Sequence, residues 1–138
     1  MLVREIMNDT LESILPSASL REAALKMRDL NLGSLPVAED GKLVGMITDR
    51  DICCRGVADG FDPATTAVRE IMSREVTFCF SDDTVTHAAR QMGTLHIRRL
   101  PVLNHDKSIA GFLSVDDVAH YSRQLAGEVL DTIRPARH

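Results

Sequence analysis

The chain has 138 residues, 44% of them hydrophobic and 26% charged, as is usual for a soluble globular protein. Its net charge of −4 argues against a protein that binds nucleic acid through a broadly basic surface. No apolar run approaches the roughly 20 residues that span a membrane, and the N-terminus lacks the apolar stretch of a signal peptide. With only three cysteines, a disulfide framework is not expected, and we predict a cytoplasmic protein.

An internal repeat organises the sequence. The segment VREIM at residues 3–7 recurs at residues 68–72, 65 positions further along. At the same offset, Leu35-Pro36-Val37 matches Leu100-Pro101-Val102. After one extra residue in the second copy, Gly45 matches Gly111 and Asp51 matches Asp117. We therefore predict a first repeat over residues 1–57, a linker over 58–66 and a second repeat over 67–138. Halves of this size bury little surface alone, so they are expected to stabilise each other.

Within the first repeat, VREIM is followed by a weak extended stretch, Leu11–Leu15, and then by a helical pattern that Ser19 can cap. The apolar residues of that helix recur at spacings of three and four: Leu20, Ala23, Ala24, Met27 and Leu30.

Two strands are predicted next, over residues 34–38 and 43–48, with the turn Glu39-Asp40-Gly41 between them. A second helix opens at Thr48 or Asp49 and stops near Gly56. The following segment contains Gly60 and Pro63, which are typical of a linker.

The second repeat gives the same order of elements. An extended stretch over 76–80 precedes a helix capped by Thr84, strands over 100–103 and 108–114, and a helix from Ser114. This last helix is predicted to continue further than its counterpart, with an apolar stripe that packs either on the repeat core or on a partner chain: Val118, Leu125, Val129 and Ile133.

The order VREIM, helix, LPV, hairpin and GMITDRDI, followed by a second copy, resembles a pair of CBS domains (a Bateman module) over nearly the whole chain. The stretch Thr48–Ile52, with Arg55-Gly56 and Asp62-Pro63, is similar to small free-standing bacterial CBS-pair proteins. The resemblance implies an α/β (α+β) fold, with two β-α-β-β-α repeats related by a pseudo-twofold axis in one compact module. It also implies a cleft for AMP, ADP, ATP or an adenosyl compound, and a homodimer, although some members bind no nucleotide.

The family's ribose motif, a Gly followed by Thr/Ser-x-x-Asp, implies nucleotide contacts for Thr48 and Asp51 and for Ser114 and Asp117. A carboxylate can accept hydrogen bonds from both ribose hydroxyls. The same spacing also describes a helix N-cap with an acidic residue three positions later. Capping and binding can coexist.

Arg98 and Arg99 have Gly33 and Ser34 as their counterparts in the first repeat. Guanidinium groups suit phosphate oxygens, and the resemblance pairs the two arginines with Thr48 and Asp51 of the other repeat. On this basis replacing Asp51 should weaken nucleotide binding more than replacing Asp117. The alternative is an ordinary solvated basic pair.

Three functions are weighed. The first is a ligand-sensing regulatory module that binds an adenine nucleotide, needs no cofactor and acts on an unknown protein partner. The second is a nucleotide-free interaction or dimerisation module. The third, a small metal-binding protein or enzyme, is disfavoured because no zinc spacing, G-x-S-x-G elbow or Walker A loop is present. No catalytic residue or metal ligand is predicted, and Cys53, Cys54 and Cys79 are expected to be structural.

Overall fold

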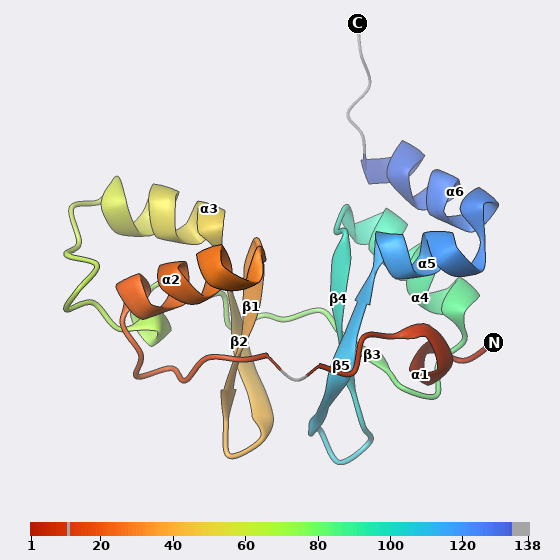
Figure 1. The fold of residues 1–138 in the computed structure, drawn as a ribbon, viewed down its shortest axis with the longest axis horizontal. Coiled ribbons are helices and arrows are strands. Elements are labelled where there is room, and N and C mark those ends of the chain that lie inside the picture. Colours follow the sequence, from red (N-terminus) through yellow and green to blue (C-terminus); the bar gives the residue numbers. More distant parts are fainter. Residues whose placement is uncertain (11, 134–138) are drawn as a thin grey trace, which may run out of the picture. The chain divides into compact units, whose positions relative to one another are not determined.

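The computed structural model describes residues 1–10 and 12–133, and the chain forms two compact units (Figure 1). The first unit is Glu12–Val76. The second unit contains the described residues of Met1–Leu11 and Thr77–His138. Each unit combines a small sheet with helices, so the predicted mixed fold class is confirmed. Across residues 1–10 and 12–133, no helix has the length and apolarity needed to cross a membrane.

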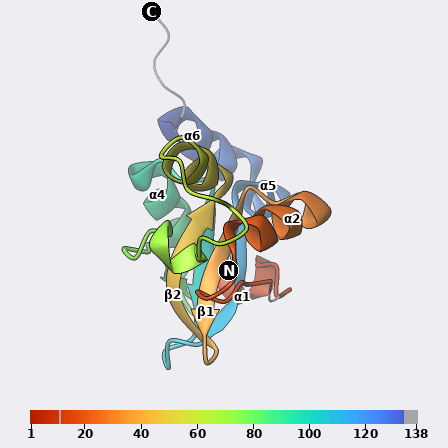
Figure 2. The ribbon, with the colours of Figure 1, turned by 90° about the vertical axis from the view of Figure 1, so that its left-hand side faces the viewer.

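The first unit is a helix-covered hairpin (Figures 1 and 2). Its strands pair antiparallel through the predicted Asp-Gly turn, where Asp40 and Gly41 both have positive φ angles, 53° and 76°. Ser19 caps the first helix as predicted, because its hydroxyl accepts a hydrogen bond from the Glu22 amide. The elements in chain order are α2 (Leu20–Leu30), β1 (Ser34–Glu39), β2 (Lys42–Thr48), α3 (Asp49–Asp51), η1 (Ile52–Val57) and η2 (Val68–Glu70).

The second unit repeats this plan and adds to it. Its three-stranded sheet has the order β3-β4-β5, with β3 parallel to β4 and β4 antiparallel to β5. Thr84 caps α4 as predicted, since its hydroxyl accepts from the His87 amide. The elements are α1 (Val3–Ile6), β3 (Cys79–Phe80), α4 (Val85–Leu95), β4 (Arg99–Leu103), β5 (Ile109–Ser114), α5 (Val115–Tyr121) and α6 (Arg123–Ile133).

The two predicted extended stretches are shorter than expected. In the first unit, Ile14 alone makes a parallel bridge to Val37, and Leu11 lies outside the described residues. In the second unit the stretch over 76–80 reduces to Cys79–Phe80. Short parallel pairings of this kind leave little periodic signal in a sequence.

The prediction of one long C-terminal helix was wrong. The chain breaks at Ser122, whose φ and ψ angles of −153° and 111° are those of extended backbone. The Ser122 hydroxyl accepts a hydrogen bond from the Leu125 amide and so starts α6 as a separate helix. The apolar stripe packs on the core of its own unit, with Val118 and Val129 buried and Leu125 half-buried, while the side chain of Ile133 lies outside the described residues.

Each VREIM segment packs in a unit formed mainly by the other repeat. The Val3 and Arg4 amides donate to the carbonyls of Asp83 and Ser81, at 2.8 and 2.9 Å. At the matching positions, the Val68 and Arg69 amides donate to the carbonyls of Ala18 and Pro16, at 2.7 and 3.0 Å. Val3 and Val68 are both fully buried. The folded units therefore differ from the repeats predicted over 1–57 and 67–138, because long-range hydrogen bonds decide where each segment docks.

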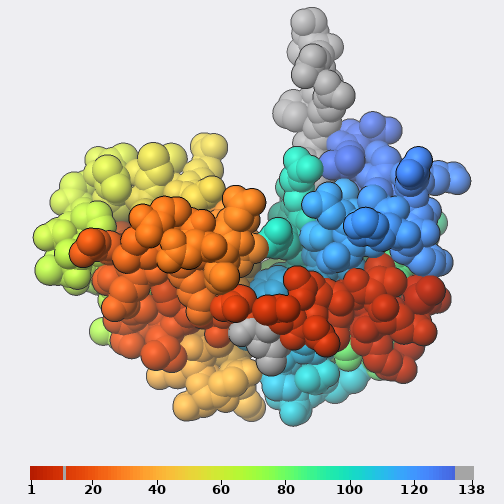
Figure 3. Space-filling model, in the orientation of Figure 1, coloured from red at the N-terminus to blue at the C-terminus, as the bar shows by residue number. Residues whose placement is uncertain are grey.

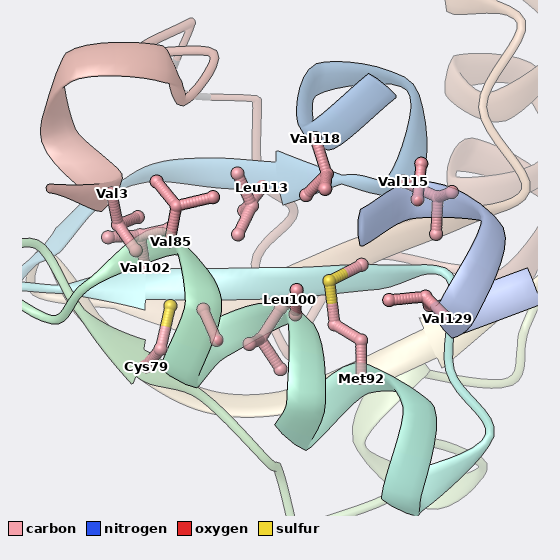
Figure 4. Packing of buried hydrophobic residues seen from close by; sticks show 13 residues of the cluster. Val3, Cys79, Val85, Met92, Leu100, Val102, Leu113, Val115, Val118 and Val129 are labelled. Carbon is pink, nitrogen blue, oxygen red and sulfur yellow. The ribbon is translucent and has the colours of Figure 1, made fainter. Parts of the chain in front are cut away.

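The cores of the two units use equivalent residues of the repeat. In the second unit, helix and strand side chains meet around Met92, Leu100 and Leu113 (Figure 4). In the first unit, Met27, Leu35 and Ile47 occupy the corresponding places. The alternation of strand residues thus turns one face of each sheet toward its helices.

The matched glycines Gly45 and Gly111 lie where the docked segments run beside a strand. Asn8 and Phe112 exchange two backbone hydrogen bonds of 2.8 Å, and Ser73 and Met46 exchange two of 2.8 and 2.9 Å. A Cβ atom on Gly111 would overlap the Asn8 carbonyl oxygen. One on Gly45 would lie 2.8 Å from the Ser73 carbonyl oxygen. Glycine is needed here for close backbone approach.

We expect Gly111→Ala and Gly45→Ala each to lower the free energy of unfolding by about 1–3 kcal/mol, because backbone must move to admit the methyl group. Gly127→Ala is the matched control. A Cβ on Gly127 in α6 would meet no atom within 4 Å beyond the adjacent residues and the backbone of its own helix, so this substitution should be neutral or stabilising by up to about 1 kcal/mol. Urea unfolding followed by circular dichroism measures the stability of all three variants. If Gly111→Ala and Gly45→Ala were as stable as Gly127→Ala, close backbone approach at these glycines would not be needed for stability.

Candidate functional site

Two strand-to-helix corners carry the residues that the sequence singles out. At the first corner, the Thr48 hydroxyl accepts from the Asp51 amide at 3.0 Å, and Asp51 Oδ2 accepts from the Thr48 amide at 3.0 Å. At the second corner, Ser114 and Asp117 form the same pair of hydrogen bonds at 3.1 and 2.9 Å. The capping interpretation is therefore confirmed at both places.

Each corner also presents its hydroxyl residue on the sheet face opposite the helices. Leu35 pairs with Ile47 in the register, and both lie in the core of the first unit. The next pair, Ser34 and Thr48, therefore points to the other face. The second unit repeats this arrangement, with Leu100 and Leu113 in the core.

The two arginines lie beside the second corner. Arg99 stands directly opposite Ser114 in the β4–β5 register, and the Arg98 carbonyl accepts from the Val115 amide at 3.0 Å. Both arginines are exposed, and within residues 1–10 and 12–133 neither side chain makes an ion pair or hydrogen bond. Two uncommitted guanidinium groups thus share a unit with Ser114 and Asp117. Their predicted pairing with Thr48 and Asp51 remains a prediction.

The first corner has a different charge arrangement. Arg55 lies one helical turn after Asp51, with Nη1 3.6 Å from Asp51 Oδ1, so each carboxylate oxygen of Asp51 faces a donor. Arg55 was not among the residues predicted for the site, although its spacing of four from Asp51 could have indicated the ion pair. In the first unit a Cβ on Gly33 would lie 3.5 Å from the carboxylate of Asp49. In the second unit Arg98 stands at the position of Gly33, and buried Val115 stands at the position of Asp49.

The cysteines and acidic residues give no metal centre within the described ranges. Across residues 1–10 and 12–133, no group of three or more His, Cys, Asp or Glu side chains is placed to hold a metal ion. Cys53 and Cys54 are exposed in η1, whereas Cys79 is buried in the core of the second unit. Burial, with a smaller contribution from the negative charge of Asp83, raises the pKa of the Cys79 thiol to about 12.

The family model of the CBS domain matches residues 3–55 and again residues 68–124. The chain belongs to the CBS-domain family. Its two matches form a tandem CBS pair, as the repeat predicted. This CBS pair is 35% identical over 133 residues to the CBS domain-containing protein YhcV of Bacillus subtilis, an alignment that covers 95% of this chain and 94% of that protein.

Solved structures agree with the family. The structure of Hypoxic Response Protein I, which has two coordinated zinc ions, matches with a TM-score of 0.80 and 30% identity over 88% of this chain and 98% of that one. The relative of the same name comes from Mycobacterium tuberculosis, and the alignment covers 86% of this chain and 82% of that protein. The CBS pair of protein MJ0100, in complex with 5′-methylthioadenosine and S-adenosyl-L-methionine, matches with a TM-score of 0.77 and 28% identity. The match covers 90% of this chain and 97% of that one.

Removing a capping hydroxyl should destabilise its unit. We expect Thr48→Ala and Ser114→Ala each to lower the free energy of unfolding by about 1 kcal/mol, since one helix-terminal amide loses its acceptor. Ser73→Ala is the control, because the exposed Ser73 side chain makes no hydrogen bond within the described residues. Chemical denaturation measures the changes. A Ser114→Ala protein as stable as the control would contradict the capping role.

The three thiols should react at very different rates. At pH 8 we expect Cys53 and Cys54 to be labelled by a maleimide within minutes, because both are exposed. Cys79 should resist labelling until the protein unfolds, since it is buried and its thiol stays protonated well above that pH. Mass spectrometry of the labelled peptides assigns each site, and rapid modification of Cys79 in the folded protein would contradict its burial.

Proposed function

We propose that this CBS pair is a regulatory module that binds an adenine nucleotide or adenosyl compound at its strand-to-helix corners. One observation carries the proposal. At the end of β2, and again at the end of β5, a hydroxyl and a carboxylate lie together, and the strand register turns the hydroxyl residue away from the core. The adenosyl ligands of the MJ0100 CBS pair support this ligand class. The same proposal assigns no catalytic residue.

The carboxylate at each corner has the chemistry to hold a ribose. Asp117 uses Oδ2 to accept from the Ser114 amide, and its other oxygen has no partner within the described residues. That oxygen can accept from ribose hydroxyls while the capping bond stays in place. Thr48 and Asp51 offer the same groups, but there a ligand competes with Arg55 for the second oxygen.

Arg98 and Arg99 supply the positive charge for a phosphate. They are exposed, carry no internal ion pair within residues 1–10 and 12–133, and Arg99 adjoins Ser114 in the register. Arginine can bind phosphate oxygens through two parallel hydrogen bonds. The contacts within the second unit thus favour Asp117 over Asp51 as the stronger ribose acceptor, which reverses the ranking expected from the sequence.

Regulation in this proposal works through a difference in affinity. A ligand shifts a protein only between states that it binds unequally, so nucleotide occupancy would favour one arrangement of the module for a protein partner to recognise. We place the chain in the cytoplasm as a homodimer. Three free cysteines are consistent with a reducing compartment.

A nucleotide-free interaction module is the second candidate. The exposed apolar side chains of the first unit favour it, with Leu15 and Val57 58% and 57% exposed. Surfaces of this kind are used for protein contacts when they are grouped.

A ligand screen tests the first proposal directly. We expect at least one of AMP, ADP, ATP, 5′-methylthioadenosine or S-adenosyl-L-methionine to raise the melting temperature by about 5 °C or more at a hundredfold excess over its Kd, since binding to the folded state alone contributes about 2.7 kcal/mol. GMP is the matched control for AMP, because the two differ in the base alone. No shift across the panel would overturn nucleotide binding and favour the second candidate.

Carboxamide variants separate binding from capping. Asp117→Asn and Asp51→Asn keep an oxygen for the capping bond but lose the charged ribose acceptor. We expect Asp117→Asn to weaken binding about 10- to 100-fold by titration calorimetry, and Asp51→Asn to weaken it less. Asp116→Asn, an exposed neighbour, is the control. A larger loss for Asp51→Asn would restore the pairing of the arginines with the first corner.

A further inference from the structure

An aromatic pair lies at the β3 edge of the sheet in the second unit. Cys79 of β3 is buried in the core, so its neighbours Phe78 and Phe80 project to the other side of the strand. Their ring centroids are 5.4 Å apart, with the ring planes at 85°. Both residues are half-buried and line an open groove of about 780 Å³ between β3 and α4. The other lining residues come from α4 and the turn before it: Asp83, His87, Arg90, Gln91, Thr94 and Leu95.

The tip of the β4–β5 hairpin packs against this aromatic pair. His105 stacks on the Phe80 ring, with centroids 4.4 Å apart and planes at 17°, and its Nε2 lies 2.8 Å from Asp82 Oδ2. Lys107 Nζ lies 5.0 Å and 5.6 Å from the ring centroids of Phe78 and Phe80. The hairpin extends away from the helices of its unit, and its tip, drawn in cyan, is at the surface (Figures 1 and 3). The rings are therefore held in place without a ligand, which lowers the entropic cost of binding.

Backbone groups along this edge are already hydrogen-bonded. The Phe78 carbonyl accepts from Gln91 Nε2 at 3.0 Å. The Phe80 amide donates to Asp83 Oδ2 at 2.8 Å, and the Phe80 carbonyl accepts from the Asp83 amide at 3.0 Å. An extended segment of another chain would have to displace these bonds to join the sheet here, since strand addition needs free backbone groups. The groove therefore suits an occupant that binds through side chains.

A positive charge from Arg90 lies on the α4 side of the groove. Arg90 and His87 are exposed, and within residues 1–10 and 12–133 neither side chain makes an ion pair or hydrogen bond. The acidic lining residue, Asp83, is occupied by the Phe80 amide. A ligand anion can therefore pair with Arg90 while an aromatic ring packs on the phenylalanines.

These groups distinguish the second repeat from the first. The first repeat has other residue types at the four matching positions: Ser13 and Leu15 in place of the phenylalanines, and Glu22 and Leu25 in place of the basic residues. The core positions, by contrast, are equivalent in the two units, as Met27 and Met92 show. The aromatic and basic groups of the groove are thus not required by the fold that the repeats share.

We propose that the groove between β3 and α4 binds a small planar aromatic molecule that carries an anionic carboxylate or phosphate group. The ring packs on Phe78 and Phe80, and the anion pairs with Arg90. Apolar walls with a few polar groups, at this volume, are typical of small-molecule sites. Ser114 and Asp117 do not line the groove, so the inference does not depend on nucleotide binding at the corners.

Charge disfavours a second copy of the chain as the occupant. Two copies that met symmetrically at this groove would bring their Arg90 guanidinium groups together, and like charges that meet at an interface are unfavourable. A small anion avoids this repulsion, because it pairs with the Arg90 of one molecule.

The test is a titration of the full-length protein with 2-naphthoate, followed by two-dimensional NMR. We expect a Kd of about 1 mM or tighter, which is within the range for a ligand of this size. Signals of the Gln91 side-chain amide and the Thr94 backbone amide should shift. 2-Naphthamide has the same ring without the charge and should bind about three- to fivefold more weakly. 2-Naphthyl phosphate is titrated in parallel, and the tighter of the two anions assigns the group as carboxylate or phosphate.

Two variants with matched controls assign the contacts. Arg90→Gln should abolish the preference for 2-naphthoate over 2-naphthamide, whereas Arg21→Gln, at an exposed position of α2, should keep it. Phe78→Leu should weaken both ligands about threefold or more, because stacked rings contribute beyond the area that they bury. Phe61→Leu, at an exposed position of the first unit, should bind as the wild type does. Arg90 is exposed, so its replacement leaves the fold intact if Phe78→Leu does not.

Four results would overturn the proposal. The first is no shift at Gln91 up to about 10 mM ligand. The second is a set of shifts centred on Ser114, which would place the anion at the corner. The third is equal affinity for 2-naphthoate and 2-naphthamide. The fourth is a groove whose signals depend on protein concentration without ligand, which would identify a second copy as the occupant.

Discussion

The docking of each VREIM segment beside a strand of the other repeat's sheet is the constraint on which both units depend. Backbone pairs join Asn8 to Phe112 and Ser73 to Met46, and the valines that open the two segments are fully buried. Gly45 and Gly111 permit this approach because they have no Cβ. A glycine that first appears to belong to a nucleotide motif therefore has a structural role, and the nucleotide contact proposed for the motif rests on the residues that follow it.

Those following residues have one observed role, capping, and one proposed role, ribose binding. Thr48 with Asp51, and Ser114 with Asp117, close the strand-to-helix corners through reciprocal hydrogen bonds. These reciprocal hydrogen bonds hold the hydroxyl and the carboxylate of each corner in a fixed relative position. Capping therefore does not compete with the proposed use of the site for a ribose, since the second carboxylate oxygen of Asp117 has no partner among residues 1–10 and 12–133.

Divergence between the repeats carries the information about function. The second repeat has two arginines before its LPV strand and a helix over its apolar side, whereas the first has Gly33 and Ser34 and an open groove lined by residues of α2 and the α3–η1 segment. One copy is thus equipped with positive charge beside its corner, and the other with an accessible apolar surface. The function proposed above, binding of a phosphorylated ligand together with contact to a protein partner, would use both kinds of surface.

The two copies, their helices and hairpins, the capping residues Ser19 and Thr84 and the CBS family were all predictable from the sequence, because periodicity, turn chemistry and caps are local properties. The sequence did not determine which copy each VREIM segment joins, since identical local sequences dock through hydrogen bonds that are long-range in the chain. Nor did it show the break at Ser122: the helical spacing of Val118, Leu125 and Val129 continues across it. Only tertiary packing, by which α6 turns back to cover α4, decided that α6 is a separate helix and that its counterpart surface in the first unit stays open.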